Sequence, residues 1–159
     1  MTETPEDMTH LNGDTLVPKT HPRIAFRGSM DTLEAETMLC QLNLPHLQAP
    51  LQELLDLARE ILRCEVLESP LAEKPLYGLT QAELRHRSHF PQEYYGQPHF
   101  MPSVADGQTV LRLNKLRTQV RETELTANQA LPKRQDILQA LNRMSSFVYI
   151  LMIEEKAKR

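Results

Sequence analysis

The segment 113–124 constrains the fold more than any other part of the chain, because it carries two parallel stripes of side chains at helical spacing. The apolar stripe consists of Leu113, Leu116 and Val120. The polar stripe consists of Asn114, Arg117, Arg121 and Glu124. Residues three and four positions apart lie on the same side of an α-helix, so the two stripes run next to each other along one helix.

The two arginines of this helix therefore lie at the edge of the core, where water is scarce. A guanidinium in such a place needs an anion or a carboxylate as its partner. The pattern leaves two interpretations of Arg117 and Arg121 open. They bind a negatively charged ligand, or they pair with acidic residues of neighbouring helices or extend to solvent.

Length and composition favour one all-α domain. The chain has 159 residues, enough for a single core, with 5% aromatic residues, 5 glycines and no tryptophan. Such a composition favours helices over sheets. The apolar periodicity predicts one helix from just after Gly28 to before Pro45, three more at 50–67, 107–129 and 136–156, and a short one capped by Thr80 and Glu83. We therefore expect a bundle of four to five helices.

The rest of the chain is predicted to be arm and loop. Residues 1–22 show no helical period and are predicted to form a flexible N-terminal arm, which leaves 23–159 as the bundle domain. A long loop at 69–108 interrupts this domain. It contains Phe90, Tyr94, Tyr95 and Phe100, too many aromatic residues for a disordered segment, so we expect it to pack on the bundle.

The expected first helix begins with Asp31 and Glu34 at a spacing similar to a capping box. The simplest role of Asp31 is then that of a helix N-cap. Leu33, Leu39 and Leu42 are predicted to face the core.

Charge and hydropathy exclude several classes of function. A net charge of −3 provides no basic surface for nucleic acid. The longest apolar run, 147–153, is much shorter than the roughly 20 residues that cross a bilayer, and the polar start lacks the features of a signal peptide. We expect a cytoplasmic protein without nucleic-acid or membrane partners, with Cys40 and Cys64 reduced and buried.

No motif predicts a phosphate loop or a metal site of the protein's own. The five glycines are isolated, so side chains and helix ends would have to hold a phosphorylated ligand. Glu83 and His86 have the spacing found in carboxylate-bridged diiron bundles, but the sequence has no second motif of this kind. A surface location is the better interpretation of His86.

Two motifs together resemble the ATP:corrinoid adenosyltransferases, helical-bundle enzymes that make adenosylcobalamin. The first motif is Leu116-Arg117-Thr118 with Arg121 and Glu124, and the second is Leu141-Asn142-Arg143-Met144-Ser145-Ser146. The stretch 19–28, followed by Asp31, is similar to the branch that serves ethanolamine utilisation. This resemblance implies that the 5′-deoxyadenosyl group of ATP is transferred to the cobalt of a reduced corrinoid, giving adenosylcobalamin and triphosphate.

The resemblance also implies roles for individual residues. The ATP-binding set would be Lys19, Thr20, Arg27, Arg121, Glu124 and Asn142. Arg121 would be catalytic because it stabilises the leaving triphosphate, and Glu124 would lie near the Mg²⁺ that accompanies ATP. Phe100 would be catalytic by excluding the lower ligand of the corrinoid, which leaves a four-coordinate Co(II) that is easier to reduce. Asp31 and Arg117 would pair across a subunit boundary.

The implied partners are ATP, a reduced corrinoid, a reductase that supplies electrons, and further copies of the chain, with a trimer favoured over a dimer. The implied location is the cytoplasm, or a bacterial microcompartment within it. The family's Thr-Gly-Asp-x-Gly-x-Thr loop is absent, Met101-Pro102-Ser103-Val104 replaces Pro-Gly-Gly, and Ser146 replaces an aspartate. The cysteine-rich metal motif often found in the N-terminal extension of ethanolamine-type members has no match. We therefore expect a truncated form, or a short member that works without that metal.

A non-catalytic bundle is the alternative function. It would be a scaffold, or a degenerate relative that binds a corrinoid or a nucleotide without turnover. The N-terminal arm separates the two hypotheses, because only the enzyme should order Lys19 and Thr20 over ATP.

Overall fold

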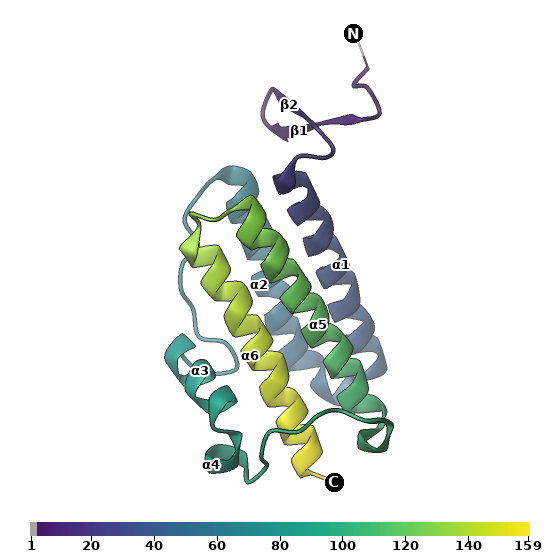
Figure 1. Cartoon of the computed structure of the whole chain (residues 1–159), viewed down its shortest axis with the longest axis vertical. Helices are drawn as coiled ribbons and strands as arrows, with labels where there is room; N and C mark the ends of the chain where they lie inside the picture. Colours follow the sequence, from purple (N-terminus) through teal and green to yellow (C-terminus); the bar gives the residue numbers. More distant parts are fainter. Residues whose placement is uncertain (1–2) are drawn as a thin grey trace.

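The computed structural model describes residues 3–159 as a bundle of four long helices (Figure 1). These are α1 (Pro22–Asn43), α2 (Gln48–Leu67), α5 (Gly107–Ala130) and α6 (Gln135–Ala157). Helix α1 packs against α2 and α5, and α5 packs against α6. The shorter helices α3 (Gln81–His89) and α4 (Pro91–Tyr95) pack on α6. Two single turns, η1 (Pro45–Leu47) and η2 (Val104–Asp106), precede α2 and α5. The predicted all-α bundle is confirmed.

A β-hairpin stands beyond the N-terminal end of α1 (Figure 1). It pairs β1 (Met8–Asn12) with β2 (Thr15–Pro18) in antiparallel register. The chain reverses at Gly13, whose φ of +46° is a conformation that glycine adopts without strain. The structure thus contains regular structure where the sequence predicts a flexible arm. Movement of this segment over a ligand stays a prediction.

Helix α1 begins at Pro22, well before the predicted start after Gly28. Proline suits the first helical turn because it has no N–H to satisfy there, and the His21 side chain accepts a hydrogen bond from the Arg23 N–H. Asp31 consequently lies inside the helix, and its interpretation as an N-cap is wrong.

The buried face of α1 also differs from the prediction. Its buried residues are Phe26, Met30, Leu33, Thr37 and Cys40. Leu33 is buried as predicted, but Leu39 and Leu42 are 52% and 72% exposed, so their predicted inward orientation is wrong. The buried residues recur at alternating spacings of four and three, and this series continues through Cys40 and includes neither Leu39 nor Leu42.

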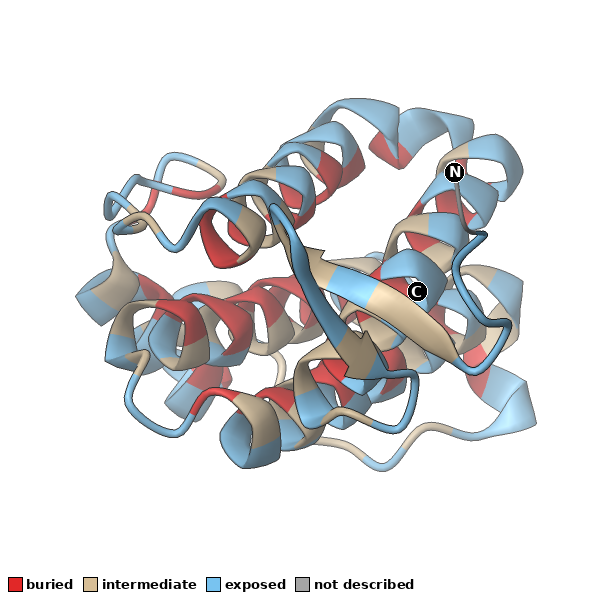
Figure 2. Cartoon of the chain, turned by 90° about the horizontal axis from the view of Figure 1, so that it is seen from above, coloured by how far each residue is buried: buried red, intermediate tan, exposed pale blue. Residues whose placement is uncertain are grey.

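The apolar faces of the other long helices are confirmed. Buried residues line the inner sides of the bundle (Figure 2). The buried stripe of α5 includes Leu113, Leu116 and Val120, and that of α6 includes Ile137, Leu141, Met144, Val148 and Leu151. Cys40 and Cys64 are buried and unbonded to each other, as predicted. A polar contact lies between α1 and α5, where the Ser29 and Thr123 hydroxyls are 2.8 Å apart.

The predicted long loop contains two helices and packs on the bundle. Thr80 and Glu83 form the predicted capping box at the start of α3. Phe100 and Tyr95 are partly buried against the core, whereas Phe90 and Tyr94 are 49% and 42% exposed. The packing of this loop is therefore confirmed for two of the four aromatic residues on which the prediction rested.

One fully buried carboxylate joins α1 to α2. Glu65 accepts hydrogen bonds from Arg23 Nε at 2.7 Å and from Arg27 Nε at 2.8 Å. Arg23 also donates to the Glu65 carbonyl at 2.9 Å. The side chains of the two arginines are only 16% and 19% exposed. Removing any one of the three side chains would therefore leave a buried or partly buried charge with fewer partners.

We expect Glu65→Gln to lower the free energy of unfolding by about 3 kcal/mol, because it leaves the partly buried Arg27 without a counter-charge and Arg23 with only the more distant Glu68. Urea unfolding followed by circular dichroism measures this loss. Glu60→Gln is the matched control, since Glu60 lies on the same helix but pairs with the exposed Arg63, and it should change stability little. Equal urea midpoints for Glu65→Gln and the unmodified chain would contradict the prediction.

Candidate functional site

A polar pocket lies where α5 and α6 pack together, next to α3. Its volume is about 370 Å³. It is lined by Ser88, Arg117, Arg121, Glu124, Asn142, Ser145, Ser146 and Tyr149. Three of the predicted ATP-binding residues, Arg121, Glu124 and Asn142, are thus brought together. We call this cavity the α5–α6 pocket.

Arg117 is half-buried in this pocket and is held by a neutral partner. Its Nε and Nη2 donate to the Asn114 side-chain oxygen at 3.1 and 2.9 Å. Burial lowers the pKa of Arg117, and the nearby positive charge of Arg121 lowers it further. In the described residues, neither arginine has a carboxylate within ion-pair distance. The interpretation that they pair with acidic residues of neighbouring helices does not hold within residues 3–159.

A chain of hydrogen bonds crosses the pocket from α5 to α6. Asn142 donates from Nδ2 to Glu124 Oε2 at 2.8 Å, and Arg143 Nη1 donates to Asn142 Oδ1 at 2.8 Å. Burial lowers the pKa of Arg143, with Arg85 adding a like charge. Donors and acceptors alternate along this chain, so the orientation of the Asn142 amide is determined by its neighbours.

The charges that line the pocket suit a polyanion accompanied by a cation. Two guanidiniums face one carboxylate, which leaves an excess of positive charge. Guanidinium groups bind phosphate oxygens through charge-assisted hydrogen bonds. The oxygens of Glu124 and Asn142 are of the type that Mg²⁺ prefers, so the donor set fits this ion.

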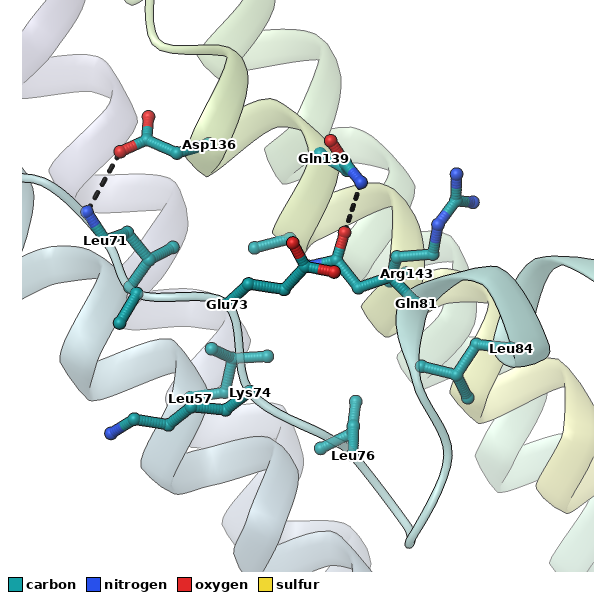
Figure 3. Close-up of a pocket in the computed structure, with 12 residues that line it drawn as sticks. Leu57, Leu71, Glu73, Lys74, Leu76, Gln81, Leu84, Asp136, Gln139 and Arg143 are labelled. Carbon is teal, nitrogen blue, oxygen red and sulfur yellow. Dashed lines mark hydrogen bonds between the residues drawn. The ribbon is translucent and has the colours of Figure 1, made fainter.

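A second, smaller cavity lies between α2, the segment 71–76, α3 and α6 (Figure 3). Its volume is about 180 Å³, and Leu57, Leu76 and Leu84 line it from three elements. Asp136 fixes one edge, because its Oδ2 accepts the Leu71 N–H at 2.9 Å. None of the predicted ligand-binding residues lines this cavity.

The remaining predicted ATP-binding residues lie elsewhere in the chain. Lys19 and Thr20 are exposed in the connection between β2 and α1. Arg27 is bound to Glu65, and its buried Nη2 has no hydrogen-bond partner among the described residues. None of the three lines the α5–α6 pocket of its own chain.

Phe100 lies in the segment between α4 and η2 and is partly buried against the core. The Lys156 amine lies 5.3 Å from the centre of its ring. Lys156 is also ion-paired with Asp106, which is buried. The Phe100 ring is therefore contacted by Lys156, which lies near the end of α6. The pocket residue Tyr149 lies on the same helix, seven positions earlier.

Two pocket residues are missed by the sequence analysis. Tyr149 follows Asn142 by seven positions and Ser145 by four, which places all three on one side of α6. This spacing is the signal for Tyr149, although the surrounding apolar run hides it. Ser88 reaches the pocket from α3 only through tertiary packing, which no local pattern predicts.

The sequence of the chain has counterparts among known proteins. The sequence model of the cobalamin adenosyltransferase family matches residues 2–155 of this chain. This chain belongs to the cobalamin adenosyltransferase family. It is 39% identical over 161 residues to the corrinoid adenosyltransferase EutT of Salmonella typhimurium, covering 97% of this chain and 60% of that protein. It is 36% identical over 162 residues to EutT of Escherichia coli K12, covering 98% of this chain and 61% of that protein. The chain thus spans about three fifths of the length of these relatives.

Membership of the cobalamin adenosyltransferase family confirms the resemblance seen in the sequence.

Within residues 3–159, no helix combines the length and apolar character needed to cross a membrane. The same residues contain no group of three His, Cys, Asp or Glu side chains arranged to hold a metal ion. Glu83, one half of the diiron-like spacing, is occupied in the capping box with Thr80.

The predicted pair of Asp31 and Arg117 is not formed within one chain. Asp31 is exposed on α1, and Arg117 donates to Asn114 instead. We expect Asp31→Ala and Arg117→Ala each to weaken self-association by about tenfold or more, because each leaves a charge unpaired at the boundary between copies. Sedimentation velocity at low protein concentration measures this change.

The charge-swapped double variant Asp31→Arg with Arg117→Asp should recover part of the association. Arg63→Ala is the control, since Arg63 pairs with Glu60 of its own helix. Full assembly of both single variants would rule out the pairing.

Proposed function

We propose that this chain transfers the 5′-deoxyadenosyl group of ATP to the cobalt of a reduced corrinoid, giving adenosylcobalamin and triphosphate. The bond between the ribose 5′ carbon and the triphosphate oxygen breaks as the Co(I) electron pair attacks that carbon. The relatives, which are named as corrinoid adenosyltransferases, support this activity over a non-catalytic bundle.

The observation that carries the proposal is the pair of arginines in the α5–α6 pocket, neither of which has a carboxylate within ion-pair distance in the described residues. Burying a guanidinium beside a second one is unfavourable, and burial and like charge both lower the pKa of Arg117. A triphosphate would supply the missing negative charge. It would also accumulate charge as it leaves, so cations positioned in advance favour the transition state over the ground state.

Three pocket residues have proposed roles in this reaction. Arg121 would contact the triphosphate directly, because it is the more exposed of the two arginines. Glu124, oriented by Asn142, would hold Mg²⁺. This ion would shield the phosphate charges when it is bound.

The N-terminal residues suggest that the site is completed by another copy of the chain. Lys19, Thr20 and Arg27 do not line the pocket of their own chain. The outward side of α1 carries Asp31 and, about two and three turns further on, Met38 and Leu42, which are 44% and 72% exposed. An apolar surface next to an unpaired charge suits an interface between copies, so we infer a homo-oligomer, with a trimer favoured over a dimer.

The wider setting follows from the same relationship. A reductase would supply the electrons that produce Co(I). The product would serve ethanolamine catabolism, in the cytoplasm or in a bacterial microcompartment.

We expect Arg121→Ala to lower turnover at saturating ATP by about 100-fold or more, because a charge-assisted contact made to the leaving group is lost. Arg121→Lys should recover only part of the activity, since an ammonium cannot reproduce the planar fork of the guanidinium. An anaerobic assay that follows adenosylcobalamin formation measures both. Arg112→Ala is the matched control, because Arg112 is an exposed arginine of the same helix outside the pocket. Unchanged turnover in Arg121→Ala would remove this residue from the site.

The Phe100 hypothesis predicts a spectroscopic change. Phe100→Ala should admit the lower ligand of cobalamin or a water and keep Co(II) five-coordinate, while folding is little affected because the ring is only partly buried. The Co(II) spectrum with ATP, compared between cobalamin and cobinamide, which lacks the lower base, measures this change. A variant that keeps the full four-coordinate signal with cobalamin would show that Phe100 serves only in packing.

A further inference from the structure

A histidine–tyrosine pair connects the segment that carries Phe100 to the α5–α6 pocket. His99 Nδ1 lies 2.8 Å from the Tyr149 hydroxyl, and the two rings stack with centres 5.6 Å apart and planes inclined by 17°. On its other side, His99 Nε2 lies 3.0 Å from the His89 carbonyl oxygen. His99 thus joins the end of α3 to α6, and its neighbour in the chain is Phe100.

The hydrogen-bonding pattern orients both side chains. A carbonyl oxygen only accepts, so His99 Nε2 carries the hydrogen in its bond to His89. In a neutral imidazole, Nδ1 is then an acceptor, and the Tyr149 hydroxyl donates to it. The two bonds together fix the plane of the imidazole ring and the position of the backbone that leads into Phe100.

Tyr149 faces both the pocket and Phe100. It lines the α5–α6 pocket together with Arg117 and Arg121. Burial raises the pKa of Tyr149, while hydrogen bonding to the Phe100 backbone and the charge of Arg117 act in the opposite direction. Tyr149 and Lys156 are seven positions apart on α6, so they approach the Phe100 segment from the same side of that helix.

We propose that Tyr149 and His99 are positioning residues that hold Phe100 in place and connect its placement to the α5–α6 pocket. The inference rests on the proposed function for its chemical meaning, because Phe100 would act on the corrinoid while the pocket binds ATP. Filling the pocket would restrict Tyr149, and through His99 it would restrict the Phe100 segment. Neither residue is assigned contact with the reacting atoms.

Tyr149→Phe tests this inference, because it removes one oxygen and keeps the stacked ring. Tyr94→Phe is a matched control, since the Tyr94 hydroxyl is hydrogen-bonded to His86 Nδ1 at 2.6 Å but does not line the pocket. In hydrogen–deuterium exchange without ligands, we expect Tyr149→Phe to speed exchange of the 97–103 segment by about tenfold, and Tyr94→Phe to leave it unchanged. Equal exchange of this segment in Tyr149→Phe and the unmodified chain would overturn the inference.

A second measurement separates positioning from general damage. Tyr149→Phe should lower turnover with cobalamin by about tenfold and turnover with cobinamide less, because cobinamide has no lower base for Phe100 to exclude. His99→Asn keeps an acceptor near the position of Nδ1, so it should lower turnover with cobalamin less than His99→Leu does. An equal loss with both corrinoids would contradict positioning of Phe100. If the unmodified chain adenosylates neither corrinoid, the proposed function fails, and the exchange measurement still decides whether Tyr149 holds the segment.

Discussion

Burial of the apolar stripe of α5 determines where its two arginines lie. Leu113, Leu116 and Val120 are fully buried, so the rotation of α5 about its axis is fixed. This rotation places Arg117 and Arg121 along the groove beside α6, where Arg117 is partly buried and Arg121 is exposed. The free energy gained by burying the leucines offsets the repulsion between two like charges four positions apart, which costs an isolated helix about 0.2–0.5 kcal/mol.

The polar contacts around this groove have distinct roles. Glu65 pairs with Arg23 and Arg27 and joins α1 to α2, far along the chain from the groove, and Glu68 lies 3.7 Å from Arg23 as a second carboxylate. The bond between Asn142 and Glu124 joins α5 to α6 and orients a carboxylate into the groove. The cluster around Glu65 contains two arginines and two carboxylates, Glu65 and Glu68, whereas neither Arg117 nor Arg121 has a carboxylate within ion-pair distance in the described residues. This difference separates a structural cluster from a candidate binding site.

Much of the bundle could be predicted from the sequence because its helices have long apolar stripes with a single period. The buried face of α6 and the capping box at Thr80 follow from local patterns alone. The start of α1 could not be predicted in this way, because the charged side chains of Arg23 and Arg27 interrupt its apolar pattern, and their burial depends on Glu65, 42 and 38 positions further on. The hairpin was missed since its strands are short and its signal is confined to the turn at Asn12 and Gly13.

The site was predictable to a similar degree. Arg121, Glu124 and Asn142 share a pocket because each lies on the polar edge of a predictable helix. Ser88 depends on how α3 packs on α6, and in the proposed oligomer the partners of Lys19, Thr20 and Asp31 would lie on another copy of the chain. Periodicity describes one helix at a time, so contacts that arise from assembly are outside what it can predict.

The central claim is that the α5–α6 pocket binds the triphosphate of ATP while the adenosyl group is transferred to cobalt. The most direct measurement is an anaerobic reaction of the unmodified chain with MgATP and chemically reduced cobalamin, in which both products are quantified. Our account predicts adenosylcobalamin and intact triphosphate in equal amounts. Tight binding of MgATP with no cobalt–carbon bond formed, or release of diphosphate and phosphate with no adenosylated product, would contradict it.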